Sequence, residues 1–267
     1  MKFGTAIGIV LSLVGVAVGA TMEGTNVMVV LNIPAISIVL VGTLGATIAA
    51  CGLEAHIRLP AIYKKAIMPD DLDLPGRVRE LVGFAEQARR DGLLALDEAV
   101  NDIADPFTRK GIQLVVDGTD PDLVAAVLDA ENEAMRKRHA AARNPFMQAG
   151  AIAPTMGIVG TVFGLVNVMN NLNNPSSLGP LIAAAFLATL MGVGSANVVF
   201  LPMANRLKEL SEAELHFREM TLEGILAIQA GDNPRVVEEK LMAYVPPKDR
   251  PTEADKQSSA AAAKQAA

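Results

Sequence analysis

Residues 144–205 read NPFMQAGAIAPTMGIVGTVFGLVNVMNNLNNPSSLGPLIAAAFLATLMGVGSANVVFLPMAN, a stretch of 62 residues without Lys, Arg, Asp or Glu. Residues 3–22 and 24–53 are also free of charge. A transmembrane helix needs about 20 mostly apolar residues, and each stretch is long enough to supply one. The polar turn at residues 170–177 divides the longest stretch into two. The sequence therefore predicts an all-α membrane protein with four transmembrane helices.

We expect these helices near residues 3–21, 31–53, 149–170 and 179–203. A soluble protein could also contain 51% hydrophobic residues, but it would distribute them with helix or strand periodicity rather than in continuous blocks. The charged region between the second and third spans has helical patterns, and Asp120-Pro121 is a strong helix start. The helix that begins there is expected to continue into the third span.

The charge pattern divides the chain into five parts. Two pairs of membrane helices alternate with two helical cytoplasmic regions, and the Pro-, Ala- and Gln-rich end is expected to be disordered. The boundaries are residues 1–53 for the first two membrane helices and their short external loop, 54–148 for the cytoplasmic helical domain, 149–204 for the third and fourth membrane helices, 205–245 for a cytoplasmic helical extension and 246–267 for the tail.

Basic residues predict the orientation, because Lys and Arg accumulate on the cytoplasmic side of a membrane protein. They cluster after the second span, before the third and after the fourth, whereas the loops at residues 22–30 and 171–178 contain none. Both termini are therefore expected to face the cytoplasm. A cleaved secretory signal at the N-terminus is the alternative. The small residues repeated from Gly4 to Gly19 favour a retained, tightly packed helix instead.

Composition argues against several functions. A net charge of −6 does not favour nucleic-acid binding. Cys51 is the single cysteine, so neither an internal disulfide nor a Cys-based metal site is expected. The three histidines form no ligand cluster, and neither a nucleotide-binding glycine motif nor a nucleophile with a base is present. We therefore expect no enzyme, no catalytic residues, no metal site and no permanently bound cofactor.

Two threonines lie at a similar predicted depth. With a rise of 1.5 Å per residue, Thr161 lies roughly 18 Å from the cytoplasmic end of the third span, and Thr189 roughly 13 Å from the outer end of the fourth. Both are then near the middle of a core about 30 Å thick. Tight packing alone would explain them. Their oxygens could also replace water around a hard cation, although a carboxylate from another chain would have to balance its charge.

Pro154 and Pro202 lie near the cytoplasmic ends of the third and fourth spans. Proline inside a helix removes a backbone hydrogen bond and bends the helix. The bend can be static, or it can act as a hinge that transmits events in the membrane to the cytoplasmic helices. The residues alone leave both interpretations open.

Residues 153–166, APTMGIVGTVFGLV, resemble the third membrane span of the flagellar stator A subunits, the MotA/PomA family. Residues 88–97, ARRDGLLALD, are similar to the torque loop of that family. Residues 110–118, KGIQLVVDG, and 226–236, LAIQAGDNPRV, resemble the PomA and MotP branch most closely. The resemblance extends from residue 1 to about residue 244.

The resemblance implies a part of the flagellar motor, which serves motility and chemotaxis. Five A subunits would surround a dimer of B subunits, each with one transmembrane helix that carries an ion-binding Asp, and a peptidoglycan-binding region. The complex would lie in the lipid of the bacterial inner membrane. Ion flow would turn the A ring, and the cytoplasmic torque domain would push on the switch-ring protein of the rotor.

The resemblance also assigns residues. Arg89 matches the basic position that faces the rotor, and Asp97 matches the acidic position, where the family usually has Glu. Their neighbours Arg90 and Glu98 are further candidates for contact with the rotor. Without the resemblance, these charged residues would be interpreted as an ordinary solvated surface. Pro154 and Pro202 match the paired prolines of the family.

Thr161 and Thr189 match positions where sodium-type stators carry Thr. We therefore favour Na⁺ over H⁺ as the transported ion. The alternatives are a proton-driven stator of the same family, an energiser of outer-membrane transport similar to ExbB or TolQ, which would have three spans, and a membrane scaffold without an ion path.

Overall fold

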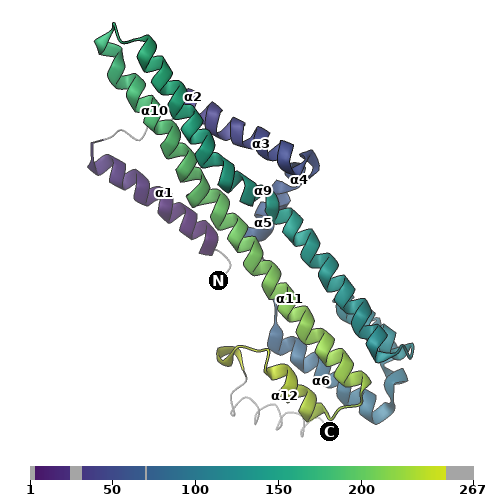
Figure 1. Cartoon of the computed structure of the whole chain (residues 1–267). Coiled ribbons are helices and arrows are strands. Elements are labelled where there is room, and N and C mark those ends of the chain that lie inside the picture. The colour runs from purple at the N-terminus through teal and green to yellow at the C-terminus, as the bar shows by residue number, and fades with distance from the viewer. Residues whose placement is uncertain (1–3, 25–31, 70, 251–267) are drawn as a thin grey trace. The chain divides into compact units, whose positions relative to one another are not determined.

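The computed structural model describes residues 4–24, 32–69 and 71–250, and every regular element in these ranges is helical (Figure 1). The chain divides into two compact units. Residues 1–70 and 137–211 form the membrane unit, and residues 71–136 and 212–267 form the soluble unit. Residue 3 of the first predicted span, residues 25–31 of the second and its loop, and residues 251–267 of the predicted tail lie outside the described ranges.

Four helices of the membrane unit are long and apolar enough to cross a bilayer. The predicted fold class, an all-α membrane protein with four spanning helices, is confirmed. The spans are α1 (Gly4–Met22), a second span made of α2 (Ile33–Ile36), η2 (Ser37–Val41) and α3 (Gly42–Cys51), the membrane part of α9 (Pro121–Asn170), and a fourth span made of α10 (Pro175–Ser195), η4 (Ala196–Phe200) and the start of α11 (Leu201–Gln229).

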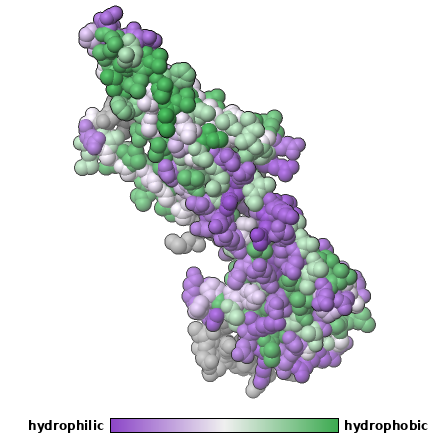
Figure 2. All heavy atoms as spheres, viewed as in Figure 1, coloured by the Kyte–Doolittle hydropathy of each residue, from purple (hydrophilic) through white to green (hydrophobic). Residues whose placement is uncertain are grey.

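The surfaces of these helices are apolar. Leu11, Phe163 and Phe186 are each more than 60% exposed, which would be unfavourable in water and is expected against lipid or a partner helix. Figure 2 shows hydrophobic residues gathered over the visible faces of α9 and α10. As expected from Asp120-Pro121, α9 begins at Pro121 and is continuous into the third span.

Two π-helical turns interrupt the spans, and the sequence did not predict them. One turn, η4, ends at Phe200, two residues before Pro202. Pro202 has no N–H to donate to the carbonyl of Val198, four residues earlier, and Val198 lies inside that turn. The other turn, η2, follows Pro34 at the start of the second span. Wider turns of this type accommodate local changes in the backbone hydrogen-bond register.

Small residues bring α9 and α10 into backbone contact. A Cβ atom on Gly157 would lie 2.9 Å from the carbonyl oxygen of Ala188, and one on Gly192 would lie 2.5 Å from that of Ala153. A Cβ on Gly164 would lie 2.5 Å from the Cβ of Ala185. Association of helices in a membrane depends on such close packing. Small residues such as Gly157, Gly164 and Gly192 therefore form the interface between α9 and α10, which together make a helical hairpin.

Residues between the second span and the soluble unit pack on the membrane helices. The short helices α4 (Leu53–Ile57) and α5 (Leu59–Ile67) follow the second span, and α5 contacts α1. Tyr63 of α5 lies with its ring centroid 6.3 Å from that of Phe146. Residues 54–69 and 137–148 thus pack with the membrane helices, whereas the sequence predicts one cytoplasmic domain over residues 54–148.

The soluble unit is a bundle of short helices around one apolar core. Side-chain caps begin several of them: Asp73 accepts a hydrogen bond from the N–H of Gly76 (2.8 Å), and Asp105 accepts one from Thr108 (3.1 Å), as expected at helix N-termini. The elements are α6 (Leu74–Asp91), η3 (Leu93–Ala95), α7 (Leu96–Val100), α8 (Pro106–Val116), α12 (Pro234–Met242), η5 (Pro247–Asp249) and the nearby parts of α9 and α11. The largest buried side chains of this core are Leu81, Leu96, Phe107, Ile112, Leu128, Met220, Ile225, Ile228 and Leu241.

The contact between α9 and α10 predicts a sharp effect of one added methyl group. In Gly192→Ala, the new Cβ would meet Ala153 O at 2.5 Å and Gly157 Cα at 3.0 Å. Both are backbone atoms, so the helices must separate. We expect a loss of about 1–3 kcal/mol in the free energy of unfolding, measured by circular dichroism in detergent.

Gly194→Ala is the matched control on the same helix, because nothing lies within 4 Å of a Cβ at that position. Its melting temperature should equal that of the wild type or exceed it. Equal melting temperatures for the two variants would show that the helices do not approach as closely as described.

Candidate functional site

The structure places Thr161 of α9 and Thr189 of α10 side by side, with their hydroxyl groups hydrogen-bonded to each other. The Thr161 hydroxyl also lies 3.0 Å from the carbonyl oxygen of Gly157 and 3.0 Å from that of Ala185. Four oxygen atoms from two helices therefore meet at one point. The small residues of the hairpin create this arrangement, because larger side chains would hold the two hydroxyls apart.

The oxygen cluster has more acceptor lone pairs than protons. Each threonine hydroxyl has one proton, and the backbone N–H groups of Thr161 and Thr189 donate to the Gly157 and Ala185 carbonyls within their helices, so four protons serve four oxygens with two lone pairs each. Lone pairs are consequently left free. A threonine in a helix often donates to the carbonyl four residues earlier, and this accounts for the contact with Gly157. The contacts with Ala185 and Thr189 join two helices and create an oxygen-rich point within the membrane unit.

The two threonines are not fully enclosed, since Thr161 and Thr189 are both half-buried. A cavity of about 390 Å³ is lined by Gly160, Gly164 and Ala188 together with residues of the second span such as Ile38, whereas neither threonine lines it. Neighbours of both threonines thus face an open space. The charge-free stretches contain no acid, so the chain itself brings oxygen dipoles to this point but no negative charge.

The two predicted hinge prolines lie where the helices are irregular or tightly packed. Pro154 is inside α9, next to Ala153, whose carbonyl faces Gly192. Pro202 follows the π turn of the fourth span. Sequence reasoning did not single out Pro145 and Pro180, which also lie inside helices. The hinge role of Pro154 and Pro202 stays a prediction.

The predicted rotor-facing residues gather at one corner of the soluble unit. Arg89 and Arg90 are in the last turn of α6, and Asp97 and Glu98 are in the first turn of α7. All four are exposed. Gly92, with a φ of 87°, reverses the chain between the two helices. Such a left-handed conformation favours glycine, and the Gln87 side chain donates to Ala95 O (2.9 Å) across the turn.

The two arginines differ in their environment. The Arg90 guanidinium donates to both carboxylate oxygens of Asp91, at 2.9–3.1 Å. These hydrogen bonds raise the pKa of Arg90 and lower the pKa of Asp91, so both groups are charged at neutral pH. Arg89 makes no ion pair with any residue that the structure describes. The positive charge of Arg89 is therefore the less compensated of the two.

Sequence reasoning missed two residues at this corner. Asp91 belongs to the torque-loop motif, but the sequence analysis does not predict that it pairs with Arg90. The only sequence signal for this pair is that the two residues are adjacent. Leu94 lies between the charged helix ends and is 76% exposed. A leucine in a helical region would be expected to have a buried side chain instead. Within the described residues, no group of three or more His, Cys, Asp or Glu side chains could hold a metal ion.

Comparisons with known proteins cover nearly the whole chain. The model of the MotA/TolQ/ExbB proton channel family matches residues 99–220. Motility protein A of Bacillus subtilis is 36% identical over 91% of this chain and 91% of that protein. Chemotaxis protein PomA of Vibrio alginolyticus is 34% identical over 94% of this chain and 95% of that protein.

Solved structures agree in fold. The chain aligns with a TM-score of 0.87 and 36% identity to the Bacillus subtilis flagellar MotAB stator complex, covering 92% of this chain and 96% of that one. It aligns with a TM-score of 0.88 and 29% identity to C. jejuni MotAB, covering 92% and 97%. With this identity, coverage and fold, the chain belongs to the MotA/PomA family of flagellar stator A subunits, within the MotA/TolQ/ExbB proton channel family.

Proposed function

We propose that this chain is the A subunit of a sodium-driven flagellar stator. With a B subunit it would form a cation channel in which Na⁺ flow drives rotation and exerts torque on the rotor switch ring. The cluster of four oxygens around Thr161 and Thr189 is the observation that carries the choice of ion. Two similar solved structures are of MotAB complexes, which supports a B-type partner.

The charge balance explains why a second chain is needed. Na⁺ is a hard cation that prefers oxygen ligands, and the two threonines offer lone pairs. The hydroxyl and carbonyl dipoles reduce the free-energy cost of removing water from Na⁺. An uncompensated charge inside a membrane is nevertheless strongly unfavourable. A carboxylate on the single membrane helix of the B subunit would balance it. That helix would pass the partly exposed hydroxyls of Thr161 and Thr189.

Proton coupling is the alternative within the family. A proton needs only the carboxylate, so a proton-driven stator would have no use for the two hydroxyls as ligands. Sequence identity does not separate the cases, since the chain is 36% identical to motility protein A of Bacillus subtilis and 34% identical to PomA of Vibrio alginolyticus. An ExbB- or TolQ-like energiser is less well supported, because the described residues contain four helices capable of spanning a membrane rather than three.

The assembly would sit in the bacterial inner membrane with both termini in the cytoplasm. Five copies would surround a B dimer whose peptidoglycan-binding regions anchor the complex. The exposed corner with Arg89, Arg90, Asp97 and Glu98 would face the rotor, where charges steer and align partners more than they add affinity. Pro154 and Pro202 would let movements at the ion site reach the soluble unit.

The choice of ion can be tested directly in motile cells. Swimming speed should rise with sodium concentration at fixed pH and should persist when a protonophore removes the proton gradient. A speed that ignores sodium and collapses with the protonophore would establish proton coupling and refute the proposal.

Removing either hydroxyl group should weaken sodium coupling. In Thr161→Ala or Thr189→Ala, one of the two hydroxyl ligands is lost, and we expect the sodium concentration for half-maximal speed to rise about tenfold, the equivalent of roughly 1.4 kcal/mol. Speed against sodium concentration is the measurement, with the amount of chain in the membrane determined in parallel.

Thr161→Ser and Thr189→Ser are the matched controls, because they keep the hydroxyl and remove only a methyl group. Both should stay close to the wild type in sodium dependence. If the Ala variants swim normally at low sodium, the threonines serve packing alone.

The environments of the two arginines predict unequal effects on torque. Arg89→Gln should lower stall torque more than Arg90→Gln, because Asp91 already compensates the Arg90 charge. In an Asp91→Asn background, Arg90→Gln should become more damaging, and this non-additivity reports the coupling of the pair. Torque of tethered cells is the measurement. Equal effects of both Gln variants, unchanged by Asp91→Asn, would contradict this assignment.

A further inference from the structure

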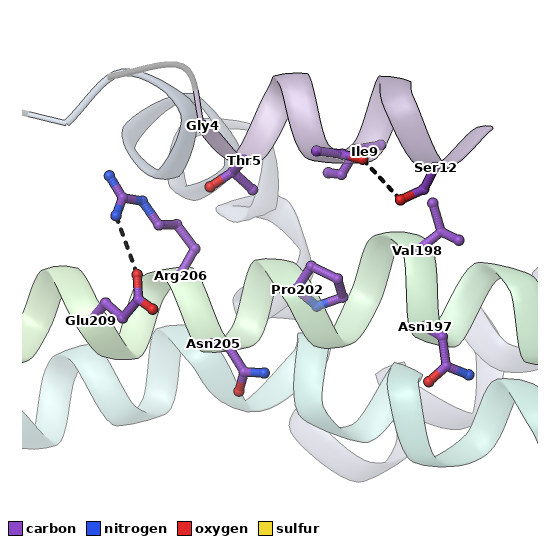
Figure 3. A pocket seen from close by; sticks show the side chains of 11 residues that line it. Gly4, Thr5, Ile9, Ser12, Asn197, Val198, Pro202, Asn205, Arg206 and Glu209 are labelled. Carbon is purple, nitrogen blue, oxygen red and sulfur yellow. Dashed lines mark hydrogen bonds and ion pairs between the residues drawn. The ribbon is translucent and has the colours of Figure 1, made fainter. Parts of the chain in front are cut away.

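A groove of about 490 Å³ runs between α1 and the end of the fourth span, within the membrane unit (Figure 3). Gly8 and Ser12 of α1 line one wall, and Val198, Pro202 and Arg206 line the other. No side chain reaches across at Gly8, because nothing lies within 4 Å of a Cβ built at that position. The groove is therefore open space that the fold leaves unfilled.

The deeper end of the groove is chemically apolar. The Ser12 hydroxyl donates to the carbonyl oxygen of Gly8 (2.9 Å), and the Asn197 amide donates to Val193 O (2.9 Å). Each of these two side chains thus directs a donor to its own helix. The groove walls at this end are therefore formed largely by apolar groups, such as the methyl groups of Val198. This end suits a hydrocarbon chain rather than a polar ligand.

The other end carries a cation whose hydrogen bonds are incomplete. Arg206 is the first charged residue after the 62 uncharged ones, so it marks the border of the hydrocarbon region. Its Nη1 donates to Glu209 at 3.2 Å. Its Nε–H is shielded from water and has no acceptor among the described residues. A shielded donor without a partner costs about 1–3 kcal/mol, and an anion would relieve this cost.

Arg206 can exchange its present partner. Figure 3 shows the Arg206 side chain extending from α11 toward the end of α1 that carries Gly4 and Thr5. The Arg206 side chain is 24% exposed and that of Glu209 is 69% exposed. An ion pair that meets water on one side adds only about 0–1 kcal/mol. A phosphate with two acceptor oxygens could displace the carboxylate and engage the guanidinium as a fork.

We propose that this groove binds an anionic phospholipid, with the phosphate on Arg206 and an acyl chain along Gly8 and Ser12. The order of the two ends matches the ligand, because a lipid places its phosphate at the border of the hydrocarbon region and its chain inside. Arg206 supplies the positive charge that favours an anionic headgroup, and Glu209, its partner at 3.2 Å, opposes that headgroup by competing for the guanidinium. The lipid would hold α1 against the fourth span beside Pro202.

Lipid titration of the full-length chain in detergent tests the proposal. Phosphatidylglycerol should raise the melting temperature, followed by circular dichroism, whereas phosphatidylcholine should not. Arg206→Gln should weaken the apparent affinity for phosphatidylglycerol about tenfold, and Arg206→Lys should restore part of it. Glu209→Gln should bind phosphatidylglycerol more tightly than the wild type, because it removes the competing carboxylate.

A second pair of variants tests the position of the acyl chain. Gly8→Leu fills the groove and should abolish the response to phosphatidylglycerol. Gly15→Leu is its control on the same helix, since a Cβ there also meets nothing within 4 Å but Gly15 does not line the groove. Unchanged helical spectra of the lipid-free variants show that each has folded.

Three results would overturn the proposal. In the first, Arg206→Gln responds to phosphatidylglycerol as the wild type does. In the second, inorganic phosphate alone reproduces the shift in melting temperature, so that the site is an anion site without a lipid. In the third, a Ser12→Cys, Cys51→Ser variant forms disulfide-linked dimers under oxidation, which would mean that a second copy covers the groove.

Discussion

The structure of the membrane unit depends on the backbone contact between α9 and α10. Glycine and alanine at the facing positions let the helices approach until Gly157 and Gly192 meet main-chain atoms of the opposite helix. In lipid this packing has to replace the hydrophobic effect, which gives no advantage to one apolar surface over another. The same contact brings Thr161 and Thr189 within hydrogen-bonding distance. Packing and chemistry are therefore not competing explanations of these residues, because the packing creates the oxygen cluster.

The second constraint is the missing negative charge. The membrane helices supply hydroxyl and carbonyl oxygens but no acid in the charge-free stretches. A chain built in this way cannot hold a cation by itself without a large electrostatic cost. Ion passage would then depend on assembly with a partner, and an isolated copy would not leak ions. The exposed apolar faces of α9 and α10 provide surface for such a partner.

Much of the fold follows from sequence patterns, and the exceptions have identifiable causes. The absence of charge in residues 144–205 predicts two spans, and Asp120-Pro121 predicts the start of α9, because both signals are local. The π turns and the packing of residues 54–69 on the membrane helices depend on tertiary contacts. At the site, helical depth predicts that Thr161 and Thr189 lie at one level. The carbonyl of Ala185 beside them has no signature in the sequence, since every residue has a carbonyl.

Pro202 lies where three features of the membrane unit meet. The π turn ends just before it, its ring lines the groove beside α1, and the first charged residue follows four positions later. Proline removes one backbone hydrogen bond and the π turn redistributes others, so bending costs less here than in a regular helix. A ligand in the groove would contact this segment directly. The lipid composition of the membrane would then bias the conformation of the fourth span at this point. Binding energy can shift a conformational equilibrium only through different contacts in its two states, so such a bias requires the groove wall at Pro202 to differ between them.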